Sequence, residues 1–125
     1  MAYPDVFKSP GVVDLAYLES SSFGRSDFIL QAIDVLLDQL PEQVADLNQA
    51  FLKGDYALVR LSAHKIKSAA GLLGIEPLRE TLRQIEAVEP QTVQSTKQLE
   101  ACVHDVTRIC VQAVTELQAE RYRYT

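Results

Sequence analysis

Apolar and polar positions along this chain follow a helical rather than a strand pattern. Apolar residues recur at intervals of three and four, and no long stretch alternates with a period of two. Neither an internal repeat nor a low-complexity tract interrupts this pattern. The sequence therefore predicts a protein built from amphipathic helices.

The longest apolar stripe predicts a helix that begins at Ser26 or Asp27 and ends at Gly54. Pro41 falls inside it, where proline removes a backbone hydrogen bond and kinks or breaks a helix. We therefore expect either one bent helix or two abutting helices. The stripe consists of Phe28, Ile33, Leu36, Leu37, Leu40, Val44, Leu47 and Phe51.

Three further helices are expected downstream. Asp55 is a suitable N-cap for a helix over residues 56–73, which Gly74 ends. A fourth helix starts near residues 76–77, with Pro77 in the first turn, and ends before residue 89. It carries Leu78, Leu82 and Ile85. The last helix has the apolar spacing of a packed bundle seam, at Leu99, Val103, Val106, Cys110, Ala113 and Leu117.

The helices together predict an all-α fold, an antiparallel four-helix bundle with a short additional N-terminal helix. That short helix is expected over residues 12–19, with Ser9 as its cap. The 125 residues suffice for one domain. Within residues 1–125 we expect an irregular N-terminal segment at 1–11 and a C-terminal tail at 118–125.

Composition narrows the possible partners. The chain is 47% hydrophobic and 23% charged, which is typical of a globular protein, and its net charge is −5. This acidic balance is a poor match to nucleic acid or to an anionic membrane surface. No run approaches the roughly 20 apolar residues of a membrane span, and the N-terminus lacks the pattern of a secretory signal. We expect a cytoplasmic protein without nucleic-acid or membrane partners.

The two cysteines support the same location. Cys102 and Cys110 lie eight positions apart, a rise of about 12 Å on one helix. That separation is too long for a disulfide, so both are expected as reduced core residues, which fits the cytoplasm. A metal site would need closer spacing and more ligands.

His64 has an unusual setting in the third predicted helix. On a wheel at about 100° per residue, it lies opposite the core stripe of that helix and therefore points to solvent. The core stripe consists of Val59, Ile66, Ala70 and Leu73. The neighbours of His64 on the wheel are small or cationic, and two leucines flank them: Ala57, Arg60, Lys67, Ser68 and Gly71, with Leu61 and Leu72 beside them.

This arrangement favours an anion or phosphoryl site. The small residues leave the ring of His64 open to a large partner, and Arg60 and Lys67 supply positive potential. Gly71 costs a helix about 1 kcal/mol relative to alanine, so a requirement other than helix stability is expected there. The alternative is that His64 is one of the many exposed histidines without a function. His104 lacks such a group of small neighbouring residues, and we expect only a structural role for it.

The stretch "AHKIKSAAGLLGIEPLRETLRQIE", residues 63–86, resembles the signature of histidine-containing phosphotransfer (HPt) domains. That signature has Ala-His, an aliphatic residue at His+2, Lys at His+3, small residues from His+4 and Gly at His+10, followed by a leucine-rich helix that ends in Glu or Gln. "VVDLAYLE" and "FLKGDYALVRLSAH" resemble the first helix of the family and its Gly-Asp link. One departure is Ser68, where many members have glycine; serine is small, so we expect it to be tolerated. The matching residues are His64, Ile66, Lys67, Ala69, Ala70, Gly74 and Glu86.

The resemblance implies that His64 accepts a phosphoryl group on Nε2 from the aspartyl phosphate of a receiver domain and passes it to another receiver. It implies that Lys67 stabilises phosphoryl oxygens. Glu86 would fix the imidazole tautomer through Nδ1–H, or would instead pair with Lys67. The receiver would dock on Arg60, Leu61, Lys65, Ser68, Gly71 and Leu72.

By the same resemblance the protein is a carrier rather than an enzyme, without a cofactor, and Mg²⁺ is expected only in the receiver partner. The expected partners are response-regulator receiver domains and a hybrid sensor histidine kinase, with the chain itself a monomer. Two alternatives stay open: a phosphorylatable HPt domain of a larger, chemotaxis-type kinase, and a bundle that binds receivers without transfer. Met1 and the short tail favour a free-standing protein. A metal-binding bundle would need paired Glu and His ligands, which the sequence lacks.

Overall fold

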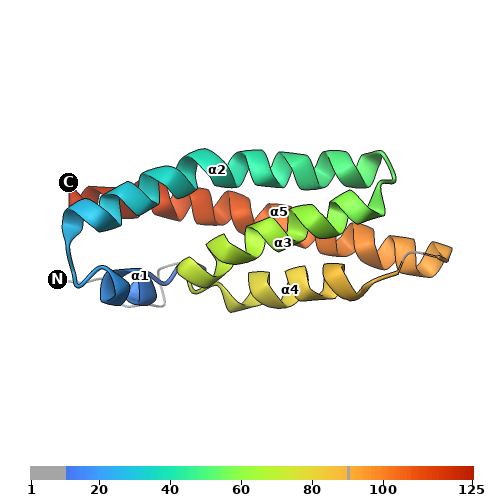
Figure 1. Ribbon diagram of the computed structural model, residues 1–125, viewed down its shortest axis with the longest axis horizontal. Coiled ribbons are helices and arrows are strands. Elements are labelled where there is room, and N and C mark those ends of the chain that lie inside the picture. Colours follow the sequence, from blue (N-terminus) through green and yellow to red (C-terminus); the bar gives the residue numbers. More distant parts are fainter. Residues whose placement is uncertain (1–10, 90) are drawn as a thin grey trace.

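A computed structural model describes residues 11–89 and 91–125, and these residues form a helical bundle. Figure 1 shows the four longer helices running along one another, with the short first helix beside one end of the bundle. The predicted fold, an antiparallel four-helix bundle with a short additional N-terminal helix, is confirmed. The described elements are α1 (Ala16–Ser21), α2 (Ser26–Leu52), α3 (Tyr56–Leu72), α4 (Glu76–Ala87), α5 (Val93–Glu120) and the 3₁₀-helix η2 (Arg121–Tyr124).

The apolar sides of the helices meet in one core. The stripes predicted for α3, α4 and α5 are buried in full. Helix α2 differs, because Phe28 is 47% exposed and Leu37 and Phe51 are only partly buried. The largest fully buried side chains come from α2 to α5 and from the link before α4: Ile29, Ile33, Leu40, Leu47, Ile66, Leu73, Ile75, Leu78, Leu82, Ile85, Leu99 and Leu117.

Helix α2 is a single helix through Pro41, the first of the two expected alternatives. Its ribbon rises over the first half and runs level over the second (Figure 1). Pro41 has no N–H, so the carbonyl of Leu37 loses its usual partner one turn on, and the helix tolerates this because Pro41 is exposed.

The predicted helix boundaries between α2 and α4 are confirmed. Gly54, with a φ of 70°, follows the end of α2, and the Asp55 carboxylate accepts a hydrogen bond from Leu58 N at 3.1 Å. Gly74, with a φ of 61°, follows α3. Glycine adopts this left-handed conformation without the Cβ clash of other residues.

The first helix is shorter at its start than predicted and begins at Ala16 rather than at residue 12. The segment before it is held instead by hydrogen bonds to other parts of the chain. Val12 N and Val13 N donate to the Glu116 carboxylate of α5, at 2.9 and 3.0 Å, and Asp14 N donates to Leu73 O at 2.8 Å. The predicted cap, Ser9, lies outside the described residues.

The C-terminal residues expected as a tail are packed against the bundle. Residues 118–120 continue α5, and η2 follows. Arg121 Nε donates to Asp34 Oδ1 of α2 at 2.6 Å, which lowers the pKa of that carboxyl, and the Tyr124 hydroxyl donates to Glu19 of α1. The segment predicted as a C-terminal tail is therefore largely helical, and these polar contacts join it to α1 and α2.

Both cysteines lie on α5 as buried free thiols. Burial raises the pKa of Cys102, and it raises the pKa of Cys110 to about 12. The thiols are therefore protonated at neutral pH and pack as small apolar groups. No helix within the described residues is long and apolar enough to cross a bilayer.

We predict that Gly74→Ala destabilises the protein more than Gly54→Ala. Both substitutions place alanine in a left-handed conformation at a cost of about 1–2 kcal/mol. A Cβ at residue 74 would also lie 3.0 Å from Asp14 O, whereas a Cβ at residue 54 meets nothing within 4 Å. Urea denaturation of the two variants and the parent measures the difference. Equal losses would mean that the Asp14 segment yields without cost.

Candidate functional site

His64 lies on the outer side of α3, as the helical wheel predicts. Its side chain is 72% exposed, while Val59, Ala63, Ile66 and Ala70 on the other side of the helix are fully buried. Burial of that side fixes the rotation of α3 about its axis, so His64 is held outward by the core rather than by contacts of its own ring.

Glu86 of α4 contacts both His64 and Lys67. Its Oε1 atom lies 3.4 Å from His64 Nδ1, and its Oε2 atom lies 3.2 Å from Lys67 Nζ. The sequence left open which of the two residues Glu86 would contact, and the structure shows that one carboxylate bridges them. The carboxylate lies on the Nδ1 side of the imidazole, and among the described residues no hydrogen bond to Nε2 is present.

The Oε1 atom of Glu86 has unused hydrogen-bonding capacity. It is buried, and no described residue donates a hydrogen bond to it, because the 3.4 Å approach of His64 Nδ1 is longer than an ordinary N–H···O bond. A buried acceptor without a donor costs free energy. A small inward rotation of the imidazole would satisfy Oε1 through Nδ1–H and would fix the tautomer with a bare Nε2.

The small residues around His64 form an open strip on α3, made of Ala57, Ser68 and Gly71, all exposed. A Cβ added at Gly71 would meet nothing within 4 Å. Nothing inside the molecule therefore requires glycine at that position, and the space it leaves faces outward.

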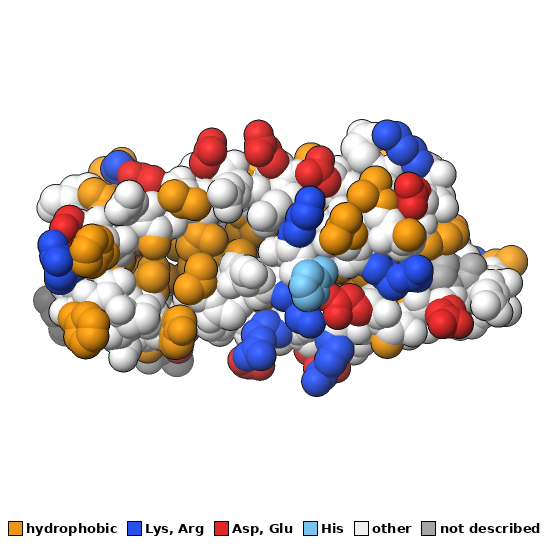
Figure 2. Space-filling model, viewed as in Figure 1, with side chains coloured by type: hydrophobic (Ala, Val, Ile, Leu, Met, Phe, Trp, Pro, Cys, Tyr) orange, Lys and Arg blue, Asp and Glu red, His pale blue; other side chains and the backbone are white. Residues whose placement is uncertain are grey.

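Two of the predicted docking residues, Ser68 and Gly71, belong to the strip, and the others lie beside it on α3. Lys65, Ser68 and Leu72 line an apolar groove of about 370 Å³ between α3 and α2. Leu61 is 50% exposed and Arg60 is half-buried on the same helix. Figure 2, viewed as Figure 1, shows apolar side chains gathered in a hollow below the edge that α2 forms.

The sequence pattern did not lead us to predict that residues of α2 line this groove. Phe28 was assigned to the core stripe, but it and Val35 are 47% and 46% exposed and line the groove with Ala32. These three residues recur at intervals of four and three on one side of α2. That spacing was the available signal of a second apolar side beside the core stripe. The other α2 residues of the groove are Gln31, Leu36, Gln39 and Gln43.

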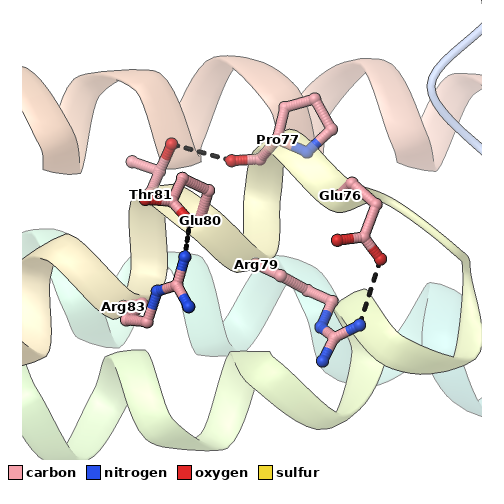
Figure 3. Close-up of polar contacts among 6 residues, drawn as sticks. All are labelled: Glu76, Pro77, Arg79, Glu80, Thr81 and Arg83. Atoms are coloured by element: carbon pink, nitrogen blue, oxygen red, sulfur yellow. Dashed lines mark hydrogen bonds and ion pairs between the residues drawn. The ribbon is translucent and has the colours of Figure 1, made fainter.

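Helix α4 presents ion pairs on its outer face (Figure 3). Arg79 pairs with Glu76 at 3.0 Å, and Arg83 pairs with Glu80. These residues and Lys67 line a shallow hollow next to the histidine. Because each arginine has a carboxylate partner one turn away, α4 adds little net charge near His64.

His104 lies on α5, exposed, with Asp105 and Arg108 paired beside it at 3.8 Å. Among the described residues, no carboxylate lies within ion-pairing distance of His104, and α5 has no strip of small residues like that beside His64. Among residues 11–89 and 91–125, no group of three or more His, Cys, Asp or Glu side chains could hold a metal ion.

Comparison with known families matches this arrangement to one of them. The family model of the Hpt domain matches residues 31–120, a stretch that contains most of α2, all of α3, α4 and α5, and with them His64, Lys67 and Glu86. Comparisons with curated proteins and with solved structures found no match.

We predict that Gly71→Ala raises the free energy of unfolding by up to about 1 kcal/mol, because alanine is the better helix former and its Cβ enters open space. Urea denaturation checks this. The buried position Ala70 provides the contrast, since Ala70→Gly removes a core methyl group as well as helix propensity and should destabilise. A loss of stability in Gly71→Ala would show that the fold itself requires the glycine.

Proposed function

The chain belongs to the Hpt domain family, which acts in phosphotransfer of two-component signalling, and we propose that it carries a phosphoryl group on His64 between receiver-domain aspartates in a multistep phosphorelay. One observation carries the assignment to this residue. His64 is exposed, and its Nδ1 faces the carboxylate of Glu86, so Nε2 is the ring nitrogen on the side away from that carboxylate.

The transfer step follows from that geometry. The lone pair of neutral His64 Nε2 attacks the phosphorus of a receiver's aspartyl phosphate, the P–N bond forms, and the bond from phosphorus to the aspartate oxygen breaks. The aspartate leaves as a carboxylate. The imidazole keeps its Nδ1 proton and becomes positively charged, and the negative charge of Glu86 stabilises it. A second receiver aspartate takes the phosphoryl group by the reverse of this step.

Lys67 stabilises the charge that the phosphoryl oxygens bear during transfer. Its side chain is 38% exposed, and its ammonium group is bound on one side by Glu86 Oε2 at 3.2 Å. An ammonium has three donors, so Lys67 keeps donors for phosphoryl oxygens while Glu86 holds it in place. Glu86 therefore acts on the transfer through both of its neighbours.

In this function the protein is a phosphoryl carrier without a cofactor of its own, and the receiver supplies Mg²⁺ and the remaining catalytic groups. A hybrid sensor histidine kinase and response-regulator receiver domains are its partners, and it acts as a monomer in the cytoplasm. The receiver lies over the open strip and its flanks, Arg60, Leu61, Lys65, Ser68, Gly71 and Leu72, which brings its aspartate to His64.

Phosphorylation of the full chain by a panel of phosphorylated receiver domains tests the proposal, with the acid and base lability of the product as the readout. A phosphohistidine is acid-labile and base-stable. Incubation with a kinase catalytic domain and ATP provides the comparison. Phosphorylation only in that second arm would favour the phosphorylatable domain of a chemotaxis-type kinase, and receiver binding without any label would favour a non-transferring bundle.

We predict that His64→Gln abolishes phosphorylation and leaves the fold intact, because the ring is exposed and makes no core contact. His104→Gln is the matched control, an exposed histidine on α5, and it should transfer at the parent rate. Label incorporation and circular dichroism check both variants. An inactive His104 variant beside an active His64 variant would refute the site.

We predict that Lys67→Ala slows transfer by roughly 10–100-fold while receiver affinity changes much less, since its charge acts mainly on the transition state. Glu86→Ala should give a smaller loss of rate, because Glu86 only orients and pairs. Single-turnover transfer rates and receiver titrations measure the two effects. Equal losses of rate and affinity in Lys67→Ala would contradict its assigned role.

A further inference from the structure

The hydroxyl group of Ser68 lies close to His64 and is not used by the fold. Ser68 is exposed, and its hydroxyl forms no hydrogen bond with any described residue. It follows His64 by four positions on α3, and residues at that spacing are neighbours on a helix surface, with about 5–6 Å between their Cβ atoms. A hydrogen-bond donor is therefore present beside the imidazole.

The threonines inside α4 and α5 use their hydroxyl groups differently. Each donates a hydrogen bond to the backbone carbonyl four residues earlier, which is a common way for a helix to satisfy a hydroxyl group. For Ser68 that acceptor would be the carbonyl of His64, and the bond is not formed. The Ser68 hydroxyl thus remains available on the outer side of α3. The threonines are Thr81, Thr96, Thr107 and Thr115, with donor–acceptor distances of 2.8, 2.9, 2.9 and 3.2 Å.

His64 separates Ser68 from the pair formed by Lys67 and Glu86. Around the axis of α3, Lys67 lies about 60° to one side of His64 and Ser68 about 40° to the other. Lys67 contacts Glu86 on the α4 side, whereas Ser68 lines the groove toward α2. Because Glu86 approaches the imidazole at Nδ1, 3.4 Å away, Nε2 lies on the side of the ring away from Glu86. Ser68 is on that side.

Resting on the proposed function, we propose that the Ser68 hydroxyl donates a hydrogen bond to a phosphoryl oxygen once Nε2 of His64 is phosphorylated. Lys67 and Ser68 then bind the phosphoryl group from opposite sides of the ring, one through an ammonium and one through a hydroxyl. Glycine, which many members of the family have at this position, offers no such donor. Serine keeps the position small and adds a ligand for the phosphoryl group.

The hydrogen bond exists only in the phosphorylated protein, so it has two measurable consequences. It shifts the transfer equilibrium toward phosphorylated His64, because it stabilises that side of the reaction alone. It also favours the dianionic form of the phosphoryl group over the monoanionic form, because a donor interacts more strongly with the more charged oxygens. The first consequence requires a receiver, and the second does not.

The first experiment loads the full chain with phosphoramidate, a small phosphodonor. His64 Nε2 attacks its phosphorus, the bond from phosphorus to the amino nitrogen breaks, and ammonia leaves. The phosphoryl group is then titrated by ³¹P NMR in the parent, Ser68→Ala and Ser68→Gly. We expect both variants to raise the pH midpoint of this titration by about 0.5. The control, Thr115→Ala on α5, removes another exposed hydroxyl and should keep the parent midpoint.

The second experiment measures the equilibrium between a phosphorylated receiver domain of the panel and the same four proteins. The ratio of phosphorylated His64 to phosphorylated receiver should fall about fivefold in Ser68→Ala and in Ser68→Gly, and it should not change in Thr115→Ala. The two substitutions at Ser68 have opposite effects on helix propensity, since alanine favours a helix more than serine and glycine less. An equal effect of both therefore reports the hydroxyl group and not the stability of α3.

The inference is wrong if the midpoint stays at the parent value in the Ser68 variants, or if alanine and glycine move it in opposite directions. It is also wrong if Thr115→Ala moves the midpoint as far, or if phosphoramidate labels an atom other than His64 Nε2. A chain that phosphoramidate labels at Nε2 but that no receiver phosphorylates would refute the proposed function. In that case the NMR titration still decides whether Ser68 binds the phosphoryl group.

Discussion

Burial of one side of α3 is the constraint on which the His64 site depends. The core side of this helix contains small residues, with Ala63 and Ala70 fully buried and Ser62 nearly so. Small side chains let the neighbouring helices approach closely. That approach brings Glu86 from α4 within reach of the outer side of α3, and the same packing leaves no freedom for α3 to rotate His64 out of position.

As a result of this packing, the carboxylate of Glu86 on α4 contacts both His64 and Lys67 on α3. A single carboxylate lies 3.4 Å from His64 Nδ1 and 3.2 Å from Lys67 Nζ, so the imidazole and the ammonium group are arranged around it. The buried, unsatisfied Oε1 atom favours an imidazole that turns toward it.

Acidic and basic side chains are separated between neighbouring helices. The chain is acidic overall. The charged side chains of α3 are nevertheless all Lys or Arg, whereas those of α2 are all Asp or Glu. On α4 the arginines Arg79 and Arg83 pair with glutamates one turn away (Figure 3), so α4 adds little net charge to the difference between α2 and α3. The apolar groove between α2 and α3 therefore lies between an acidic and a basic helix, with His64 on the basic one.

The sequence alone determined the four longer helices, because three- and four-residue apolar spacing, the cap at Asp55 and the glycines act locally. It also determined the outward position of His64, because a helical wheel needs only the period of the helix. It could not determine how far apart residues on different helices lie. Only the tertiary structure decided that Glu86 bridges His64 and Lys67, that Phe28 and Val35 join Lys65 in one groove, and that residues 12–15 and 121–124 are held by Glu116, Asp34 and Glu19. Each of these contacts depends on the rotation and separation of packed helices, which the side chains of the whole core set jointly and no local pattern records.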